Sequence, residues 1–514
     1  MGARITTKKL AKNVLISVIA QVISLAVSFV MGLIVPKFID GYSYAYWQLY
    51  LLYVSYVGIL HFGLLDGLML RYGAYDYDEL DKKRIRSQFQ CLLMITSVPA
   101  ILLAGISAAV MQGADCIIFI LVAAGIVLKN VSTYNSHVFQ LTNRINQYVV
   151  VTLAQRITYG LVVVLLLVCR VTDFYWYCIA DLIGDCVGIT IGIVFNRGSL
   201  YFGKSLSLRD TIVECRQNLS AGFVLLLANW TAILLMGSAR MVIEWHWGEL
   251  VFGQVAFAFS LTNIFLTFVT AVSVVLFPSL KRIRGEALPQ MYQDIRQVLS
   301  PVLFLALLFY FPGCWIVEKW LPNYADSLKY LAILLPIIVF SSKVTLLTNN
   351  YLKVYRREKS MLIVNLISVA LGFGLFALCA YVFDHLTALL VCTVAVVMFN
   401  SVLSEIVVMR IIKVRIVKDF IFEALLTVGF ILVASLLDLW WGCLAYFVLF
   451  AVYCLLNYKA IFNLFRRVVR RRAPAAAEGE APAGALPEDA LSADPDHPDI
   501  RADGGNNLHD EGKE

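Results

Sequence analysis

Seven ionisable side chains of this sequence lie inside long apolar stretches. Charged groups are costly in an apolar environment, and inside membrane helices they commonly mark binding sites or transport pathways. Lysine and arginine there could hold phosphate or another anion, lysine as a point charge and arginine through two parallel hydrogen bonds. Carboxylates could neutralise these cations or carry protons. The seven residues are Asp66, Lys129, Arg156, Asp181, Asp185, Lys343 and Glu405.

The two lysines of this set lie at similar depths. Lys129 precedes the basic residue Arg144 by fifteen positions, and Lys343 precedes Arg356 by thirteen. At 1.5 Å per helical residue, both lysines are roughly 20 Å from the loop that follows. Two lysines at matching depths suggest a cationic lining.

Acidic residues are distributed unevenly around these cations. Asp181 and Asp185 are one turn apart on one helical face, so they could neutralise Lys129 and Arg156, or act as an ion-coupling pair. The second half of the apolar region contains a single such acid, Glu405, near the end of its stretch. Lys343 therefore has no evident partner and is the strongest candidate for a contact with substrate.

Several kinds of chemistry lack a signature in the sequence. It has no phosphate-binding glycine-rich loop, no cluster with metal-ligand spacing and no credible catalytic triad. The eleven cysteines are scattered through apolar segments without a CxxC pair, as expected of small packing residues. We therefore predict a protein that is not an enzyme and has no catalytic residues, metal or cofactor.

The composition implies that membrane-spanning helices position these residues. Of the 514 residues, 60% are apolar and 15% are charged, and the mean hydropathy is +0.78. Apolar windows of about twenty residues can cross a bilayer. The predicted fold is an all-α, polytopic membrane protein with fourteen spans, at 13–35, 44–69, 89–111, 115–139, 149–169, 174–195, 219–239, 250–278, 299–317, 327–350, 361–383, 386–408, 420–437 and 440–457.

Basic residues predict the orientation of the spans, because they concentrate on the cytoplasmic side. If the amino terminus is cytoplasmic, inner segments hold 32 lysines and arginines, and outer segments hold four. Both termini should then be cytoplasmic. Residues 1–12 form a basic amino terminus and 196–218 a cytoplasmic linker. The acidic, Pro- and Ala-rich composition of 473–514 predicts a disordered cytoplasmic tail.

The apolar region contains two related halves. Gly41 followed by Tyr46-Trp47-Gln48 resembles Gly248 followed by Phe252-Gly253-Gln254, and an offset of about 210 residues recurs at other positions. This offset equals six spans, so the copies share one orientation and are related by a pseudo-twofold axis along the membrane normal, a plan found in transporters. We predict an amino-terminal lobe at 13–195, a carboxy-terminal lobe at 219–408, a cleft between them, and two extra helices at 420–457.

Short motifs at the span ends carry a resemblance to a known family. In this order and spacing, over roughly residues 10 to 420, they resemble the polysaccharide transporters of the multidrug/oligosaccharidyl-lipid/polysaccharide flippase superfamily. One departure is Ala239, which stands where the family usually has an acid before Arg240. The motifs are Val35-Pro36-Lys37-Phe38-Ile39-Asp40-Gly41, Phe62-Gly63-Leu64, Gly237-Ser238-Ala239-Arg240-Met241-Val242-Ile243, Leu276-Phe277-Pro278-Ser279-Leu280 and Tyr351-Leu352 through Arg356.

The resemblance implies a flippase of the O-antigen or capsule type. Such a protein moves an undecaprenyl-diphosphate-linked oligosaccharide from the inner to the outer leaflet of a bacterial cell membrane by alternating access, for surface polysaccharide biosynthesis. Glycosyltransferases and a polysaccharide polymerase are candidate partners, and nucleic acid is not. The expected cationic cleft comprises Lys343, Lys129, Arg156 and Arg240, with Gln21 and Asn263 as polar lining and Asp181 and Asp185 as ion-coupling candidates.

Two other functions fit parts of the sequence. A multidrug or cation antiporter of the same superfamily should line its cleft with acids, whereas the second lobe here has Lys343. A membrane enzyme such as a sugar polymerase would need a large outer loop, and the predicted outer loops are short.

Overall fold

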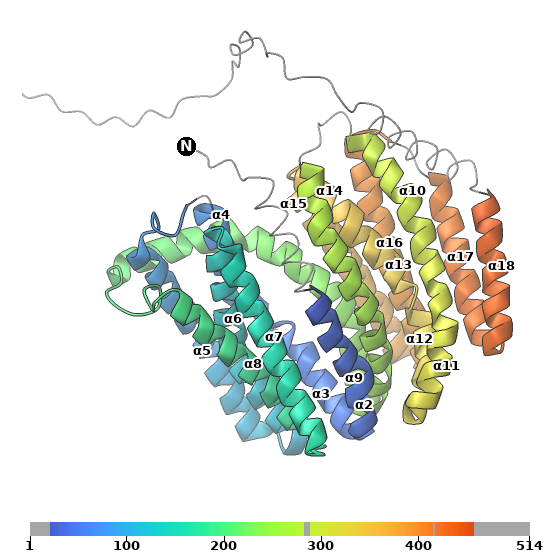
Figure 1. The fold of residues 1–514 in the computed structure, drawn as a ribbon, viewed down its shortest axis with the longest axis horizontal. Coiled ribbons are helices and arrows are strands. Elements are labelled where there is room, and N and C mark those ends of the chain that lie inside the picture. The colour runs from blue at the N-terminus through green and yellow to red at the C-terminus, as the bar shows by residue number, and fades with distance from the viewer. Residues whose placement is uncertain (1–20, 74, 282–287, 415–416, 457–514) are drawn as a thin grey trace, which may run out of the picture. The chain divides into compact units, whose positions relative to one another are not determined.

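The computed structural model describes residues 21–73, 75–281, 288–414 and 417–456, and this part of the chain forms helices without a β-strand (Figure 1). The all-α prediction is confirmed. In chain order the α-helices are α2 (Val35–Phe38), α3 (Gly41–Val54), α4 (Leu64–Tyr72), α5 (Lys82–Val110), α6 (Gly113–Leu141), α7 (Ile145–Val168), α8 (Phe174–Phe195), α9 (Leu208–Lys281), α10 (Leu288–Ala306), α11 (Tyr310–Trp320), α12 (Ser327–Leu334), α13 (Ile337–Lys343), α14 (Asn349–Val354), α15 (Glu358–Ala377), α16 (Leu386–Ile412), α17 (Val417–Leu436) and α18 (Leu439–Leu456).

Helix α9 contains two spans, because the chain reverses at Gly248. This glycine has φ 79° and ψ −178°, outside the helical region, a conformation that glycine adopts without steric cost. The guanidinium of Arg240 lies 4.9 Å from the centre of the Phe259 ring, and Met236 and Asn263 line one cavity. Both pairs are nearly symmetric about Gly248, as expected for an antiparallel helical hairpin.

The fourteen predicted spans can be matched to helices of the described chain when α9 is counted as two. Twelve helical segments of the described chain are long and apolar enough to cross a membrane, and the bent pair Gly41–His61 and Leu64–Tyr72 adds a thirteenth. The reversal of α9 divides one segment into spans seven and eight, which makes fourteen. The first span is described from Gln21 onward. Residues 1–12 and 473–514 lie outside the described residues, and the predicted linker at 196–218 is helical from Leu208 onward.

Small residues bring spans two and seven into close contact. The two helices of span two meet at 56°, and Phe62 and Gly63 at the bend have positive φ values of 48° and 88°. Beyond the bend, a Cβ atom on Gly67 or Gly222 would overlap the backbone of the facing helix. Small residues commonly allow membrane helices to approach this closely. The beginning of α9 thus packs on α4 of the amino-terminal lobe.

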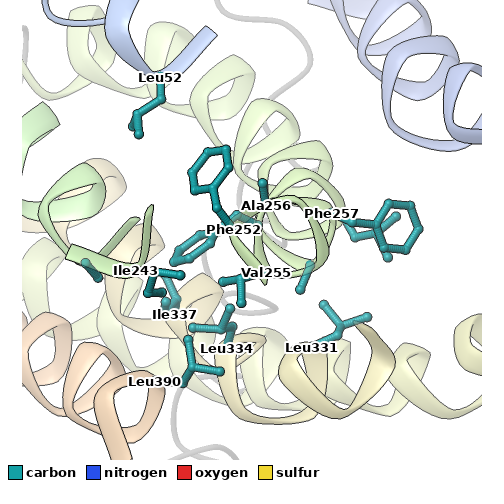
Figure 2. Close-up of a cluster of buried hydrophobic side chains, with 14 of the residues drawn as sticks. Leu52, Ile243, Phe252, Val255, Ala256, Phe257, Leu331, Leu334, Ile337 and Leu390 are labelled. Atoms are coloured by element: carbon teal, nitrogen blue, oxygen red, sulfur yellow. The ribbon is translucent and has the colours of Figure 1, made fainter. Parts of the chain in front are cut away.

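At one face of the bundle, a single apolar core is shared by the two lobes. Toward the opposite face, each lobe has its own separate apolar cluster. We call this opposite face the basic face; it carries the loops that begin at Gly73, Thr142, Asn196, Tyr355 and Lys413. A large cluster of buried side chains draws on both lobes, and Figure 2 shows Leu52, Phe252, Leu334 and Leu390 within it. Two smaller clusters lie toward the basic face, one in each lobe.

Polar and aromatic contacts reinforce the junction away from the basic face. The indole nitrogen of Trp320 donates a hydrogen bond to the carbonyl of Leu33, at 3.0 Å. The ammonium of Lys37 lies 3.2 Å from the centre of the Trp320 ring, and the rings of Tyr44 and Tyr324 are 5.4 Å apart. These contacts connect the ends of spans one and two to span nine and the segment that follows it.

Candidate substrate cavity

A cavity of about 350 Å³ lies between the lobes. Spans one, two, five, six, seven and eight all contribute to its wall. The side chains combine charged, amide, hydroxyl and apolar groups, which suits an amphiphilic ligand better than a purely apolar one. Its polar and aromatic lining consists of Ser28, Trp47, Gln48, Ser55, Arg156, Tyr159, Asp181, Arg240, Ser260 and Asn263.

Neither of the two arginines on this wall forms a salt bridge with a carboxylate of the described residues, although the charge of Arg156 acts on Asp185 at longer range. Arg240, on span seven, faces the Phe259 ring, and its buried Nε has no hydrogen-bond acceptor. Arg156, on α7, is exposed to the cavity and forms no ion pair with a described carboxylate. A guanidinium nitrogen that is buried without a partner, as Nε of Arg240 is, is unfavourable, because it loses hydrogen bonds to water and gains none in return. An anionic ligand would offset this cost with bidentate hydrogen bonds.

Lys129 is neutralised by the aspartate pair. Its ammonium lies 2.7 Å from a carboxylate oxygen of Asp181 and 2.7 Å from one of Asp185. The hydroxyl of Tyr50 donates to Asp181 at 3.1 Å, and the amide of Gln155 donates to Asp185. Both acids pair with Lys129, and neither forms a salt bridge with Arg156; their ion-coupling role stays a prediction. Asp181 also reaches the cavity wall.

Lys343 does have acidic partners, so the premise of its assignment to the cleft is wrong. Its side chain is 1% exposed; the ammonium contacts Glu405 and lies 2.6 Å from a carboxylate oxygen of Glu423. Arg296 joins the same group, at 2.6 Å from Glu405 and 3.2 Å from Glu423. Glu423 lies on α17, the first of the two extra helices, which the sequence analysis left outside the two lobes. Lys343 does not line the central cavity.

The other predicted residues are placed as follows. Arg156, Arg240, Asp181 and Asn263 share the central cavity; Lys129 and Asp185 lie directly behind Asp181. Gln21, half-buried near the start of the described part of span one, is not among the cavity-lining residues. A contact between any of these residues and substrate stays a prediction.

Sequence reasoning missed some of the wall and its supports. Gln48 lies on the wall, and its place in the repeated Tyr46-Trp47-Gln48 motif was the available signal. Tyr50 and Gln155 hold the aspartates. Nothing in their local sequence distinguishes them from other polar residues in apolar helices.

An apolar groove adjoins the central cavity. It has a volume of about 310 Å³ and lies between spans one, eight, nine and ten. Ile264 lines both spaces. At the rim, the side chains of Phe29 and Phe309 are 50% and 65% exposed, so the groove wall continues onto the outside of the bundle. Such a surface matches hydrocarbon rather than a charged group.

Comparisons with solved structures agree with this architecture. The lipid II flippase MurJ, in an inward closed conformation, matches with a TM-score of 0.63 and 11% identity, over 87% of this chain and all of that one. An inward-facing multidrug resistance MATE transporter of the MOP superfamily matches with 0.58 and 13%, over 77% and 94%. An outward-facing structure of such a transporter matches with 0.55 and 14%, over 78% and 96%.

These similarities show the fold, and at such low identity they show the fold alone. A scan of family models and a search of curated protein sequences found no match. The chain is a multi-pass, all-α membrane protein with the fold of MOP-superfamily transporters, the superfamily that its span-end motifs resemble.

Proposed function

We propose that this protein is a flippase that moves an undecaprenyl-diphosphate-linked oligosaccharide across a bacterial cell membrane. The observation that carries the proposal is a cavity with two unpaired arginines that shares Ile264 with an apolar groove. A polyprenyl diphosphate has a charged head next to a long hydrocarbon chain. Arg156 and Arg240 suit the diphosphate, and the groove suits the first part of the chain.

The division of the core supports alternating access. Joined lobes at one face and separate apolar clusters at the other favour a state in which the cavity is reached from the basic face. The basic loops favour a cytoplasmic location for this face, which would place both termini there. A lipid-linked glycan for surface polysaccharide would then enter from the inner leaflet and leave toward the outer leaflet as one lobe rocks against the other.

The charge balance disfavours the antiporter alternative. The cavity and its immediate border hold three cations, Lys129, Arg156 and Arg240, and two anions, Asp181 and Asp185. The balance is one positive charge. A carrier of cationic drugs would have to desolvate its substrate next to unpaired arginines, which is unfavourable.

Transport in proteoliposomes tests the proposal. A fluorescent polyprenyl diphosphate that carries one N-acetylhexosamine would be flipped by the wild type and scored by its accessibility to an impermeant quencher. We expect Arg156→Gln and Arg240→Gln each to lower the initial rate at least about tenfold, the loss of about 1.4 kcal/mol of charge-assisted binding.

Arg170→Gln is the matched control, because Arg170 is an exposed arginine in the loop after α7, outside the cavity. Its rate should stay within twofold of wild type. Wild-type rates in the double variant Arg156→Gln/Arg240→Gln would contradict the proposed function.

A further inference from the structure

A second polar cavity, which we call the amide cavity, lies within the carboxy-terminal half of the bundle. It has a volume of about 240 Å³ and adjoins the central cavity at Asn263, which lines both. Among the described residues, no charged side chain contributes to its wall. Its polar lining consists of Asn263, Thr270, Ser341, Thr345, Asn349, Asn365 and Asn400.

Two of the four asparagines are held in place by other protein groups. The side-chain amide of Asn400 donates to the carbonyl oxygen of the Asn365 side chain at 3.1 Å and to the hydroxyl of Ser368 at 3.0 Å. The amide of Asn365 donates to the backbone carbonyl of Ala228 at 3.3 Å. These bonds connect spans seven, eleven and twelve and give this part of the wall a defined arrangement.

The other two asparagines have no such partners. The side chains of Asn263 and Asn349 form no hydrogen bond with any described residue. Asn263 is exposed and Asn349 is half-buried. Each amide group offers two donors and one carbonyl acceptor. Inside a membrane such groups need water or a ligand, because an unsatisfied amide in an apolar environment is strongly unfavourable.

The chemistry of this wall matches a neutral ligand rich in hydroxyl groups. A hydrocarbon chain would leave the amides unsatisfied, and a diphosphate would find no cation. A sugar hydroxyl both donates and accepts, so neighbouring hydroxyls of one ring can pair with an amide and with the hydroxyls of Ser341 and Thr345. The volume admits one sugar ring rather than a whole oligosaccharide.

We propose that the amide cavity is a glycan-binding subsite, which takes the sugar attached to a diphosphate held by Arg156 and Arg240. This inference rests on the proposed function and extends it. The two spaces meet at Asn263, and the groove meets the central cavity at the next residue, Ile264. Sugar, diphosphate and hydrocarbon would thus occupy three adjoining spaces in the order in which they are bonded. Asn349 and Thr345 select the sugar.

The test compares two probes in the same proteoliposome assay: a polyprenyl diphosphate with one N-acetylhexosamine, and the same lipid without sugar. Asn349→Leu and the isosteric Thr345→Val remove polar groups from the wall. We expect each to lower the rate for the sugar-bearing probe at least fivefold and to leave the rate for the sugarless probe within twofold. Arg240→Gln should lower both rates.

Two controls separate the failures. Ser220→Ala, at an exposed position of α9 outside the three spaces, should leave both rates unchanged, and size-exclusion profiles identify any variant that misfolds. If wild type moves both probes and both amide-cavity variants keep the wild-type ratio of rates, this inference alone is overturned. If wild type moves neither probe, the proposed function is overturned, and this inference with it.

Discussion

The two lobes contain equivalent lysine clusters that differ in their surroundings. Lys129 lies on the fourth span of the first lobe and binds Asp181 and Asp185 of the sixth span. Lys343 lies on the fourth span of the second lobe and binds Glu405 of its sixth span. The predicted internal repeat would place a lysine and its acid at corresponding positions of the two lobes.

Exposure distinguishes the clusters. In the first cluster the side chain of Lys129 is 23% exposed and that of Asp181 13%, and only Asp185 is fully buried, whereas Lys343, Glu405 and Glu423 of the second cluster are all at most 1% exposed. The first cluster borders the central cavity. The second cluster is covered by α17, a helix that follows the six spans of the carboxy-terminal lobe. Helix α17 contributes Glu423, and also Asp419, which lies 2.5 Å from Arg296.

The two clusters indicate that a helix outside the two lobes can change the surroundings, and with them the role, of a lysine found at a similar place in each lobe. In the first lobe the lysine remains next to a space that a ligand can reach. In the second lobe, the carboxylates of α17 complete a buried ion network that attaches spans thirteen and fourteen to the lobe. We therefore expect the second cluster to govern stability and the first to govern transport.

The largest effect on stability should come from Lys343→Met. Removal of one partner of a buried ion network leaves an uncompensated carboxylate and typically costs about 3–5 kcal/mol. Thermal unfolding of the purified protein in detergent would measure the loss as a lower Tm.

Two further variants test whether the loss of stability comes from the buried ion network. Lys343→Met/Glu423→Gln removes one charge of each sign and should recover much of the lost stability. Lys329→Met removes a lysine that is 79% exposed and paired with Asp326, and such surface pairs contribute about 0–1 kcal/mol. Equal Tm values for Lys343→Met and Lys329→Met would contradict the buried network.

Lys129→Met should cost less stability and more transport. Water can solvate the freed carboxylate of the partly exposed Asp181, and the buried Asp185 keeps the hydrogen bond from Gln155, so we expect a loss of about 1–3 kcal/mol. The unpaired aspartates would also repel a diphosphate in the adjacent cavity. The flipping assay should show at least a tenfold lower rate in protein that still elutes as a single species. A transport rate close to wild type would place the cluster outside the pathway.

Asp181→Asn should change the affinity for substrate rather than the fold. Asp185 still pairs with Lys129, while the cavity wall loses one negative charge. Coulomb repulsion between two unit negative charges about 8 Å apart is about 2 kcal/mol at an effective dielectric constant of 20, so the KM for the diphosphate probe should fall at least about tenfold. A higher KM would indicate that Asp181 contacts the substrate favourably.

Asp419→Asn should have the smallest effect. The carboxylate of Asp419 is 37% exposed, and Arg296 keeps Glu405 and Glu423. Partly exposed pairs contribute about 1 kcal/mol or less, so the Tm should fall far less than in Lys343→Met. A loss as large as that of Lys343→Met would mean that the outer end of the network is as well sealed as its centre.

The membrane-spanning helices could be predicted from the sequence alone, and the internal repeat stays a prediction. Each span is defined by the transfer free energy of about twenty consecutive residues, which is a local property. The break between spans seven and eight has a second local signal. Gly248 occupies the place of Gly41 in the predicted repeat, and glycine permits a backbone conformation that is unfavourable to other residues.

Which charged side chains contact each other depends on the tertiary structure. Lys343 pairs with a carboxylate 80 positions away, on α17, and Arg240 reaches a cavity that six spans build. Whether a buried lysine faces a ligand or a carboxylate depends on the rotation of its helix and on the helix packed behind it. These are long-range properties of packing. The mean hydropathy of a window does not predict them, because it is the same whichever face of the helix is turned toward the ligand.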